Sequence, residues 1–134
     1  MQSQKLLKAA PTIFVSKVAR QMASRNLGAA LIVDDERLIG ILTERDIVFR
    51  VVAPGLDAAT TCARDVMTPD PHVVHPGKPF GHALLIMHEN GFRHLPVVEN
   101  DRPIGIVSAR SAMDPDLEEF TAEVHRRKHL QNLR

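Results

Sequence analysis

LIVDDERLIGILTERD, residues 31–46, returns 65 residues later as PVVENDRPIGIVSARS, residues 96–111. The two stretches align without a gap. The same 65-residue offset holds further upstream, where Pro11 matches Pro76 and Met22 matches Met87. The identical pairs within the stretches are Val33/Val98, Arg37/Arg102, Ile39/Ile104, Gly40/Gly105, Ile41/Ile106 and Arg45/Arg110. A repeat of this period means that one structural unit occurs twice in the chain.

The first copy alternates between helical and extended patterns. An apolar stripe at i, i+3, i+4 and i+7 predicts an amphipathic helix that ends near Asn26. Two apolar runs around the polar residues 34–37 predict a β-hairpin, and Thr43 is a helix N-cap. The stripe of the first helix is Val15, Val18, Ala19 and Met22, and the inner face expected for the second is Ile47, Val48, Val51 and Val52.

The second copy repeats this order. A lead strand is expected at residues 72–74, and Pro79 suits the first position of a helix. Asn90-Gly91 ends that helix, a second hairpin follows at residues 95–107, and Ser108 caps the next helix. The helical stripe is Phe80, Ala83, Leu84 and Met87.

These patterns predict an α/β (α+β) fold built from two tandem β-α-β-β-α repeats in a pseudo-twofold arrangement. We assign residues 5–60 to the first repeat and residues 61–113 to the second, whose lead strand lies within 66–75. Residues 114–134 are expected to form a C-terminal helix that starts at Asp114-Pro115. One repeat has too little core to fold alone, whereas two packed sheet to sheet have enough.

Composition excludes several classes of protein. Among 134 residues, 17 Lys and Arg oppose 16 Asp and Glu, and there is no Trp or Tyr, so a nucleic-acid partner is not expected. No apolar run is long enough for a membrane span or a signal peptide, and we expect a cytoplasmic protein.

The single cysteine, Cys62, allows neither an internal disulfide nor a thiolate zinc site. His125 and His129 have a metal-pair spacing, but the basic residues 126–128 between them argue against a metal. No catalytic set stands out, so an enzyme is not expected.

Four segments resemble one known family. They are Val66-Met67-Thr68-Pro69-Asp70-Pro71, Gly91-Phe92-Arg93-His94-Leu95-Pro96-Val97-Val98, Gly105-Ile106-Val107-Ser108 and Gly40-Ile41-Leu42-Thr43-Glu44-Arg45-Asp46. Together they are similar to the cystathionine-β-synthase (CBS) domain pair, and the resemblance covers about residues 5–113. It implies a regulatory module that usually dimerises into a flat disc. It also implies clefts between the repeats that bind AMP, ADP, ATP, S-adenosylmethionine or NAD.

Thr43 and Asp46 are the first candidates for such a cleft. The T-x-x-D spacing is a capping pattern, and a carboxylate also accepts two hydrogen bonds from the hydroxyls of a ribose. In the family the matching Asp holds the ribose. Because a cap uses only part of the acceptor capacity of Asp46, both roles are compatible, and we expect Asp46→Ala to weaken binding with little loss of stability. Ser111 replaces the carboxylate in the second copy, so we expect one ribose site per chain.

Arg93 and His94 are the candidates for phosphate recognition, because a guanidinium offers a planar fork of donors to phosphate. The family arrangement implies that they share a cleft with the two residues above and with the lead strand of the second repeat. This favours AMP, ADP or ATP over S-adenosylmethionine or NAD. The whole expected site is Thr43, Asp46, Asp70, Pro71, His72, Arg93, His94 and Pro96. The mirror cleft would combine Ser108 and Ser111 with Lys5, Leu6, Leu7, Gly28, Ala29 and Ala30.

Two functions therefore remain open. One is a nucleotide-sensing regulatory module that transmits ligand binding to an unidentified protein partner. The other is a structural dimerisation or adaptor module without a small ligand. In both cases we expect a homodimer, formed through the apolar helix faces at residues 15–22 and 80–87.

Overall fold

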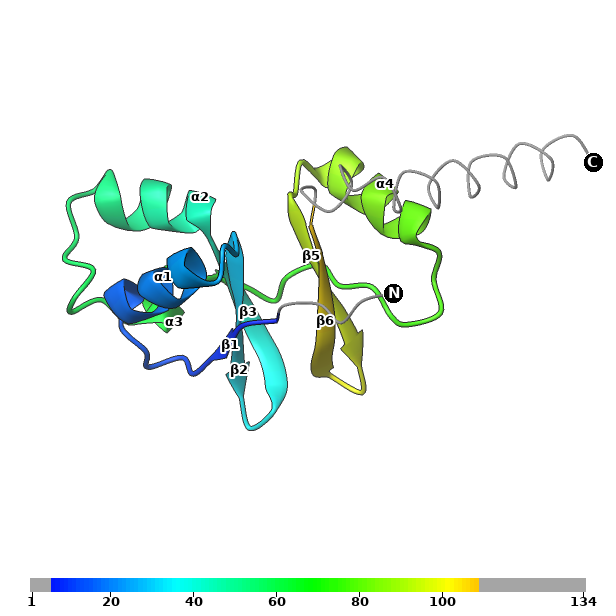
Figure 1. The fold of residues 1–134 in the computed structure, drawn as a ribbon, viewed down its shortest axis with the longest axis horizontal. Helices are drawn as coiled ribbons and strands as arrows, with labels where there is room; N and C mark the ends of the chain where they lie inside the picture. Colours follow the sequence, from blue (N-terminus) through cyan, green and yellow to red (C-terminus); the bar gives the residue numbers. More distant parts are fainter. Residues whose placement is uncertain (1–5, 109–134) are drawn as a thin grey trace, which may run out of the picture.

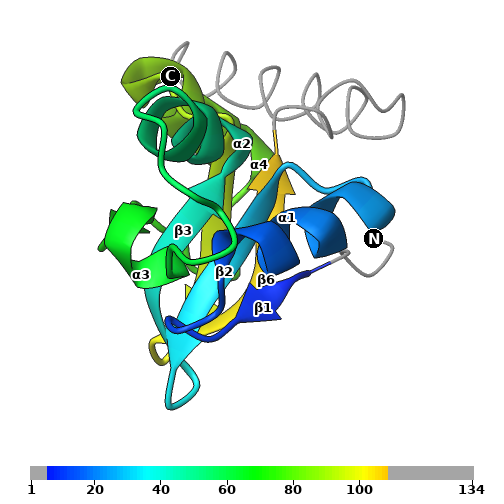
Figure 2. The same cartoon turned by 90° about the vertical axis from the view of Figure 1, so that its left-hand side faces the viewer.

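A computed structural model of the chain describes residues 6–108. The expected C-terminal helix at residues 114–134 and the helix after Ser108 lie outside the described residues. Within the described part, two small α/β halves stand with their sheets facing each other and their helices on the outer sides (Figures 1 and 2). The mixed α and β architecture is as the sequence predicts, whereas the short elements α3 and β4 between the repeats were not expected.

The first half forms a four-stranded sheet in the order β1-β2-β3-β4. β1 is parallel to β2, and the other pairs are antiparallel. Helix α2 continues directly into the π-helical segment η1. The elements are β1 (Lys8–Ala9), α1 (Val15–Ser24), β2 (Ala29–Asp34), β3 (Arg37–Thr43), α2 (Glu44–Ile47), η1 (Val48–Val52), α3 (Ala63–Val66) and β4 (Thr68–Pro69).

The second half contains α4 (Phe80–Asn90), β5 (His94–Glu99) and β6 (Arg102–Ser108). The lead strand expected at residues 72–74 is reduced to one parallel bridge between Val74 and Val97. Pro71 and Pro76 bracket it, and a proline has no N–H to extend a ladder. Pro79 is the N-cap of α4 rather than its first helical residue, and Gly91 ends the helix with a left-handed φ of 71°.

The two hairpins repeat each other in detail. Both turns use two consecutive residues with positive φ, at 51° and 66° in Asp35 and Glu36 and at 54° and 66° in Asn100 and Asp101. Such turns match the right-handed twist of the strands. The register of each hairpin also shifts at equivalent positions, at Ile32/Val33 and at Val97/Val98. The backbone therefore follows the 65-residue repeat.

The helix faces that we expected a second copy to cover are buried inside the chain itself. Val15, Val18 and Met22 belong to the core of the first half, and Ala83 and Met87 belong to that of the second. The expectation that these faces remain free is therefore wrong. A third cluster joins the halves, where Ile106 packs against Ala29, Leu31 and Ile41.

Exposed apolar side chains gather on η1 instead. The sequence assigned Val48 and Val52 to the inner face of this helix, but they are 52% and 66% exposed, whereas Val51 is buried. The π-helical turn, in which the Ala53 amide donates to the Val48 carbonyl, is wider than an α-turn and changes the side that each residue faces. Phe49, at 59% exposed, lies on the same segment.

Candidate functional site

Thr43 and Asp46 form the capping box that their spacing predicts. The Asp46 amide donates to Thr43 Oγ1 at 3.1 Å, and the Thr43 amide donates to Asp46 Oδ2 at 3.0 Å. The Thr43 hydroxyl also donates to the same carboxylate oxygen at 3.0 Å. This reciprocal arrangement fixes the point where β3 becomes α2.

Asp46 is also tied to residues that the sequence analysis did not single out. Its other oxygen, Oδ1, accepts a hydrogen bond from Thr68 Oγ1 at 3.1 Å and lies 3.6 Å from Arg50 Nε. Asp46 is only 6% exposed. Its acceptor capacity is therefore largely in use, and a small loss of stability on substitution is no longer expected. The only sequence signal for Thr68 was its place in the Val66-Met67-Thr68-Pro69 motif.

Asp70, Pro71 and His72 lie where the chain crosses from the first half to the second. The Asp70 amide donates to the Ile39 carbonyl at 3.2 Å, so this residue still follows β3. Two residues later, the His72 ring lies against Phe92 of the second half, with 5.0 Å between the ring centroids. Asp70 and His72 are exposed.

His94 reaches from the second half to the first. A Cβ added to Gly28 would lie 2.8 Å from His94 Nε2 and 2.5 Å from Glu44 Oε1, so both side chains crowd the bare α-carbon of Gly28. Glu44 is the first residue of α2, directly after Thr43. The structure therefore brings His94 to the helix start that carries the capping box. Sequence reasoning missed Glu44, and it placed Gly28 in the mirror cleft.

The remaining expected residues differ in their accessibility. Arg93 is exposed and makes no hydrogen bond or ion pair with another described residue. Pro96 is fully buried in β5, where its carbonyl accepts the Val74 amide, so its side chain contributes packing. In the mirror cleft, Ser108 pairs with His94 in the β5–β6 ladder, while Lys5 and Ser111 lie outside the described residues.

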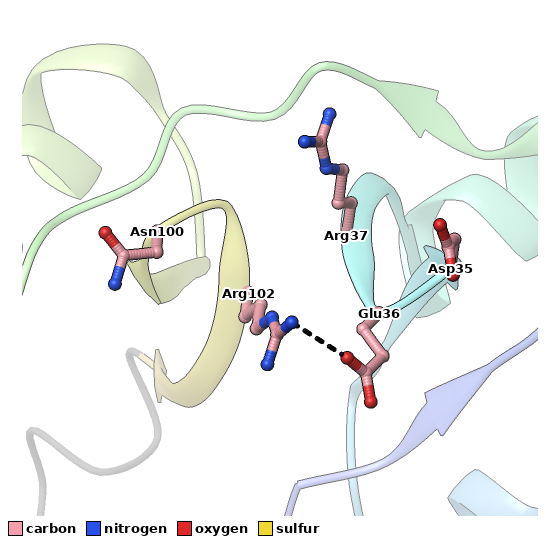
Figure 3. Close-up of a pocket in the computed structure, with 5 residues that line it drawn as sticks. All are labelled: Asp35, Glu36, Arg37, Asn100 and Arg102. Atoms are coloured by element: carbon pink, nitrogen blue, oxygen red, sulfur yellow. Dashed lines mark ion pairs between the residues drawn. The ribbon is translucent and has the colours of Figure 1, made fainter.

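A separate hollow of about 410 Å³ lies at the tips of the two hairpins (Figure 3). It is at the opposite end of β3 from Thr43, and its lining contains none of the expected site residues. Arg102 and Glu36 form an ion pair of 3.1 Å there, and both side chains are mostly exposed. The hollow is lined by Asp35, Glu36, Arg37, Asn100 and Arg102.

Within residues 6–108, no three His, Cys, Asp or Glu side chains come together as a metal site would require. In the same part of the chain, no helix combines the length and the apolar character needed to cross a membrane.

The CBS domain family model matches the chain twice, at residues 1–53 and 63–115. The chain therefore belongs to the CBS domain family and carries two CBS repeats. It is 39% identical over 97 residues to the CBS domain-containing protein CBSCBSPB1 of Arabidopsis thaliana, which covers 72% of this chain and 18% of that protein. It is also 36% identical over 117 residues to an uncharacterised 17.7 kDa protein of Acidianus ambivalens. That alignment covers 86% of this chain and 66% of the other protein. The chain thus spans less than a fifth of the longer of these two relatives.

Solved structures share the fold. A signal-transduction protein with CBS domains from Burkholderia ambifaria superposes with a TM-score of 0.78 at 28% identity, over 87% of this chain and 85% of that one. A CBS domain protein of Pyrobaculum aerophilum, solved in complex with AMP, superposes with a TM-score of 0.79 at 24% identity. The superposition covers 91% of this chain and 95% of that one. The CBS domain pair of protein MJ0100, solved with 5′-methylthioadenosine and S-adenosyl-L-methionine, superposes with a TM-score of 0.72 at 25% identity. The superposition covers 81% of this chain and 88% of that one.

Proposed function

We propose that the chain is a regulatory module that binds an adenine nucleotide of the AMP, ADP or ATP class between its two repeats. The observation that carries the proposal is the meeting of His94 from the second repeat with the helix start of the first, where Asp46 is held by Thr43. A ligand that contacts both sides is sensitive to how the repeats pack. Such a ligand shifts the population of packed states, and a partner protein responds to the shift. The module itself performs no chemistry.

The ligand class is supported by relatives of the same fold. The structures from Pyrobaculum aerophilum and of protein MJ0100 hold AMP and sulfur-containing adenosine derivatives, respectively. In this chain, we assign the ribose to Asp46 and Thr43, with Asp70, Pro71 and His72 on the crossing segment beside them. Pro96 shapes the buried side. Because Asp46 already accepts three hydrogen bonds, a ribose hydroxyl binds the one acceptor position that remains, on Oδ1.

The phosphate is assigned to Arg93 and His94. Arg93 has an exposed guanidinium without a partner among the described residues, so its donors are available to an anion. This assignment distinguishes a nucleotide from adenosine and from S-adenosylmethionine, neither of which carries a phosphate.

Isothermal titration calorimetry with AMP and adenosine tests the proposal. The wild-type chain should bind AMP more tightly than adenosine, at one site per chain. Arg93→Ala should remove most of that preference, while Arg64→Ala, which alters another exposed arginine, should leave it unchanged. Equal binding of AMP and adenosine by all three proteins would refute the phosphate assignment. No binding of AMP, ADP, ATP or S-adenosylmethionine would favour the adaptor alternative.

We also propose that the chain forms a homodimer through the exposed apolar side chains of η1 and the following turn, namely Val48, Phe49, Val52 and Leu56. A helix that is apolar on its inner and outer sides is normally covered on both. A second copy of the same face fits because these four exposed side chains are apolar and the face can pair with itself across a twofold axis. Arg45 stacks on the Phe49 ring at 4.5 Å and holds that ring in place.

Sedimentation velocity tests the interface. Val52→Asp should convert a dimer into a monomer at tens of micromolar, because it buries a charge against an apolar surface. Ala59→Asp, which adds the same charge at an exposed position outside the patch, should leave the dimer intact. A monomeric wild-type chain, or a dimer that tolerates Val52→Asp, would refute this interface.

A further inference from the structure

The segment that joins the two repeats is fastened to the first repeat around Asp46. Thr68 donates its hydroxyl to Asp46 Oδ1 at 3.1 Å, and Arg50 Nη1 donates to the Met67 carbonyl at 3.0 Å. The Met67 side chain lies over the bare α-carbon of Gly40, and β4 pairs with β3 at the same place. Residues 66–69 are therefore attached to the first repeat by polar, apolar and backbone contacts.

The other end of the same segment is attached to the second repeat. The Val74 amide donates to the Pro96 carbonyl, and the Val98 amide donates to the Val74 carbonyl, both at 2.9 Å. The Asp70 amide still donates to the Ile39 carbonyl of the first repeat, so only residues 71–73 lie between the two attachments. A change in how the segment is held at Asp46 is thus transmitted over a short distance to β5, the strand that starts with His94.

The Asp46 carboxylate has one acceptor position that is not fully used. Oδ2 accepts two hydrogen bonds, both from Thr43, and Oδ1 accepts one, from Thr68. A carboxylate oxygen accepts about two hydrogen bonds. The remaining place on Oδ1 is covered by the Arg50 guanidinium at 3.6 Å, which is a charge contact rather than a hydrogen bond. A hydroxyl group that binds Asp46 takes this place most easily, because Arg50 is half exposed and can move.

We propose that Arg50 and Thr68 are positioning residues that lock Asp46 to the linker at residues 66–69, and that a ligand hydroxyl bound at Oδ1 displaces Arg50 and loosens the linker. The first step concerns the ligand-free chain. The second step rests on the proposed function. Arg50 belongs to η1, the segment that carries the exposed Val48, Phe49 and Val52. Its displacement therefore reaches the proposed dimer face as well as the second repeat.

Hydrogen exchange of the ligand-free chain tests the first step. The amides to follow are those of Met67 and Asp70, which donate to the Ala63 and Ile39 carbonyls. Loss of one charged hydrogen bond should make local opening about tenfold more frequent, so Arg50→Met and Thr68→Val should speed exchange at both amides by that factor. Amides inside helix α4, which is not part of the segment or of the strand attached to it, should not change. Thr68→Ser should restore the wild-type rate because it keeps the hydroxyl.

The matched control is Arg64→Met, which alters an exposed arginine in α3, on the same stretch of chain. If Arg50→Met and Thr68→Val exchange no faster than this control, the lock does not exist. If all amides of the chain accelerate together, the two residues support the fold as a whole, and the local role is refuted.

Titration with AMP tests the second step. In the wild-type chain, AMP should speed exchange at Met67 and Asp70 while it slows exchange at the start of α2. Arg50→Met should bind AMP severalfold more tightly, because the ligand no longer has to displace the guanidinium. Slower linker exchange with AMP, or weaker binding by Arg50→Met, would overturn displacement and make Arg50 a ligand contact. If the wild-type chain does not bind AMP by calorimetry, the second step fails together with the proposed function. The ligand-free experiment still decides the first step.

Discussion

Asp46→Ala should destabilise the chain by about 3 kcal/mol, a large effect for one polar residue. The substitution leaves half of the capping box intact, because the amide of residue 46 can still donate to Thr43 Oγ1. It removes the acceptor of the Thr43 amide, of the Thr43 hydroxyl and of the Thr68 hydroxyl. These three donors are part-buried, so water replaces the carboxylate only incompletely.

The magnitude follows from the hydrogen bonds that are lost, because the N-cap bond from the residue-46 amide to Thr43 Oγ1 remains. Loss of hydrogen bonds to a charged acceptor costs roughly 1.5–3 kcal/mol. The contact with Arg50 is assigned no energy, because that side chain is 50% exposed and solvent screens the pair. A total of about 3 kcal/mol corresponds to a fall in Tm of roughly 10 °C for a chain of this size.

Thermal unfolding followed by circular dichroism measures this effect. Asp65→Ala is the matched control, since Asp65 is exposed and no hydrogen bond of its side chain is found among the described residues. Asp46→Asn should fall between the wild type and Asp46→Ala, because its amide oxygen keeps one acceptor. Melting temperatures of Asp46→Ala and Asp65→Ala within about 2 °C of each other would show that the carboxylate network contributes little, and the reasoning from its contacts would be wrong.

Two further substitutions follow from the structure. Gly28→Ala should change stability by less than about 1 kcal/mol in urea unfolding, because its Cβ would meet only the ends of the Glu44 and His94 side chains, which can turn away, whereas a loss above about 3 kcal/mol would show that the two side chains are held rigidly there. Arg102→Gln should cost less than about 1 kcal/mol and should lose even that effect in 1 M salt, since its ion pair with Glu36 is exposed on both sides; a larger, salt-insensitive loss would contradict a surface pair.

The hairpins, helices and capping box could be predicted because their signals are local. Apolar periodicity defines α1 and α4, polar turn residues define the hairpins, and the T-x-x-D spacing defines the cap. The 65-residue repeat then showed that each element occurs twice. These features depend on residues close together in the chain, and within the described residues the structure has α1, α4, both hairpins and the capping box of the first repeat.

The contacts that depend on packing could not be predicted in the same way. The apolar periodicity predicts an α-helix after Thr43 with Val48 and Val52 on its inner face. The segment is instead π-helical, and both side chains are exposed to solvent. Thr68 lies 22 residues from Asp46, and no local pattern reports a hydrogen bond over that distance. The contact of His94 with the Gly28 region joins different repeats. The assignment of ligand groups to the expected site residues stays a prediction.

The hairpin tips are held together by a hydrogen bond that runs one way only. The Leu38 amide donates to the Asp101 carbonyl at 2.9 Å. The residue equivalent to Leu38 in the second repeat is Pro103, which has no N–H, so the mirror bond cannot form. In a homodimer of single repeats, every substitution would appear on both sides of the axis, and this difference could not exist. Because both repeats lie in one polypeptide, each half can mutate independently. The same independence allows one position of the repeat to be Asp46 in the first copy and Ser111 in the second.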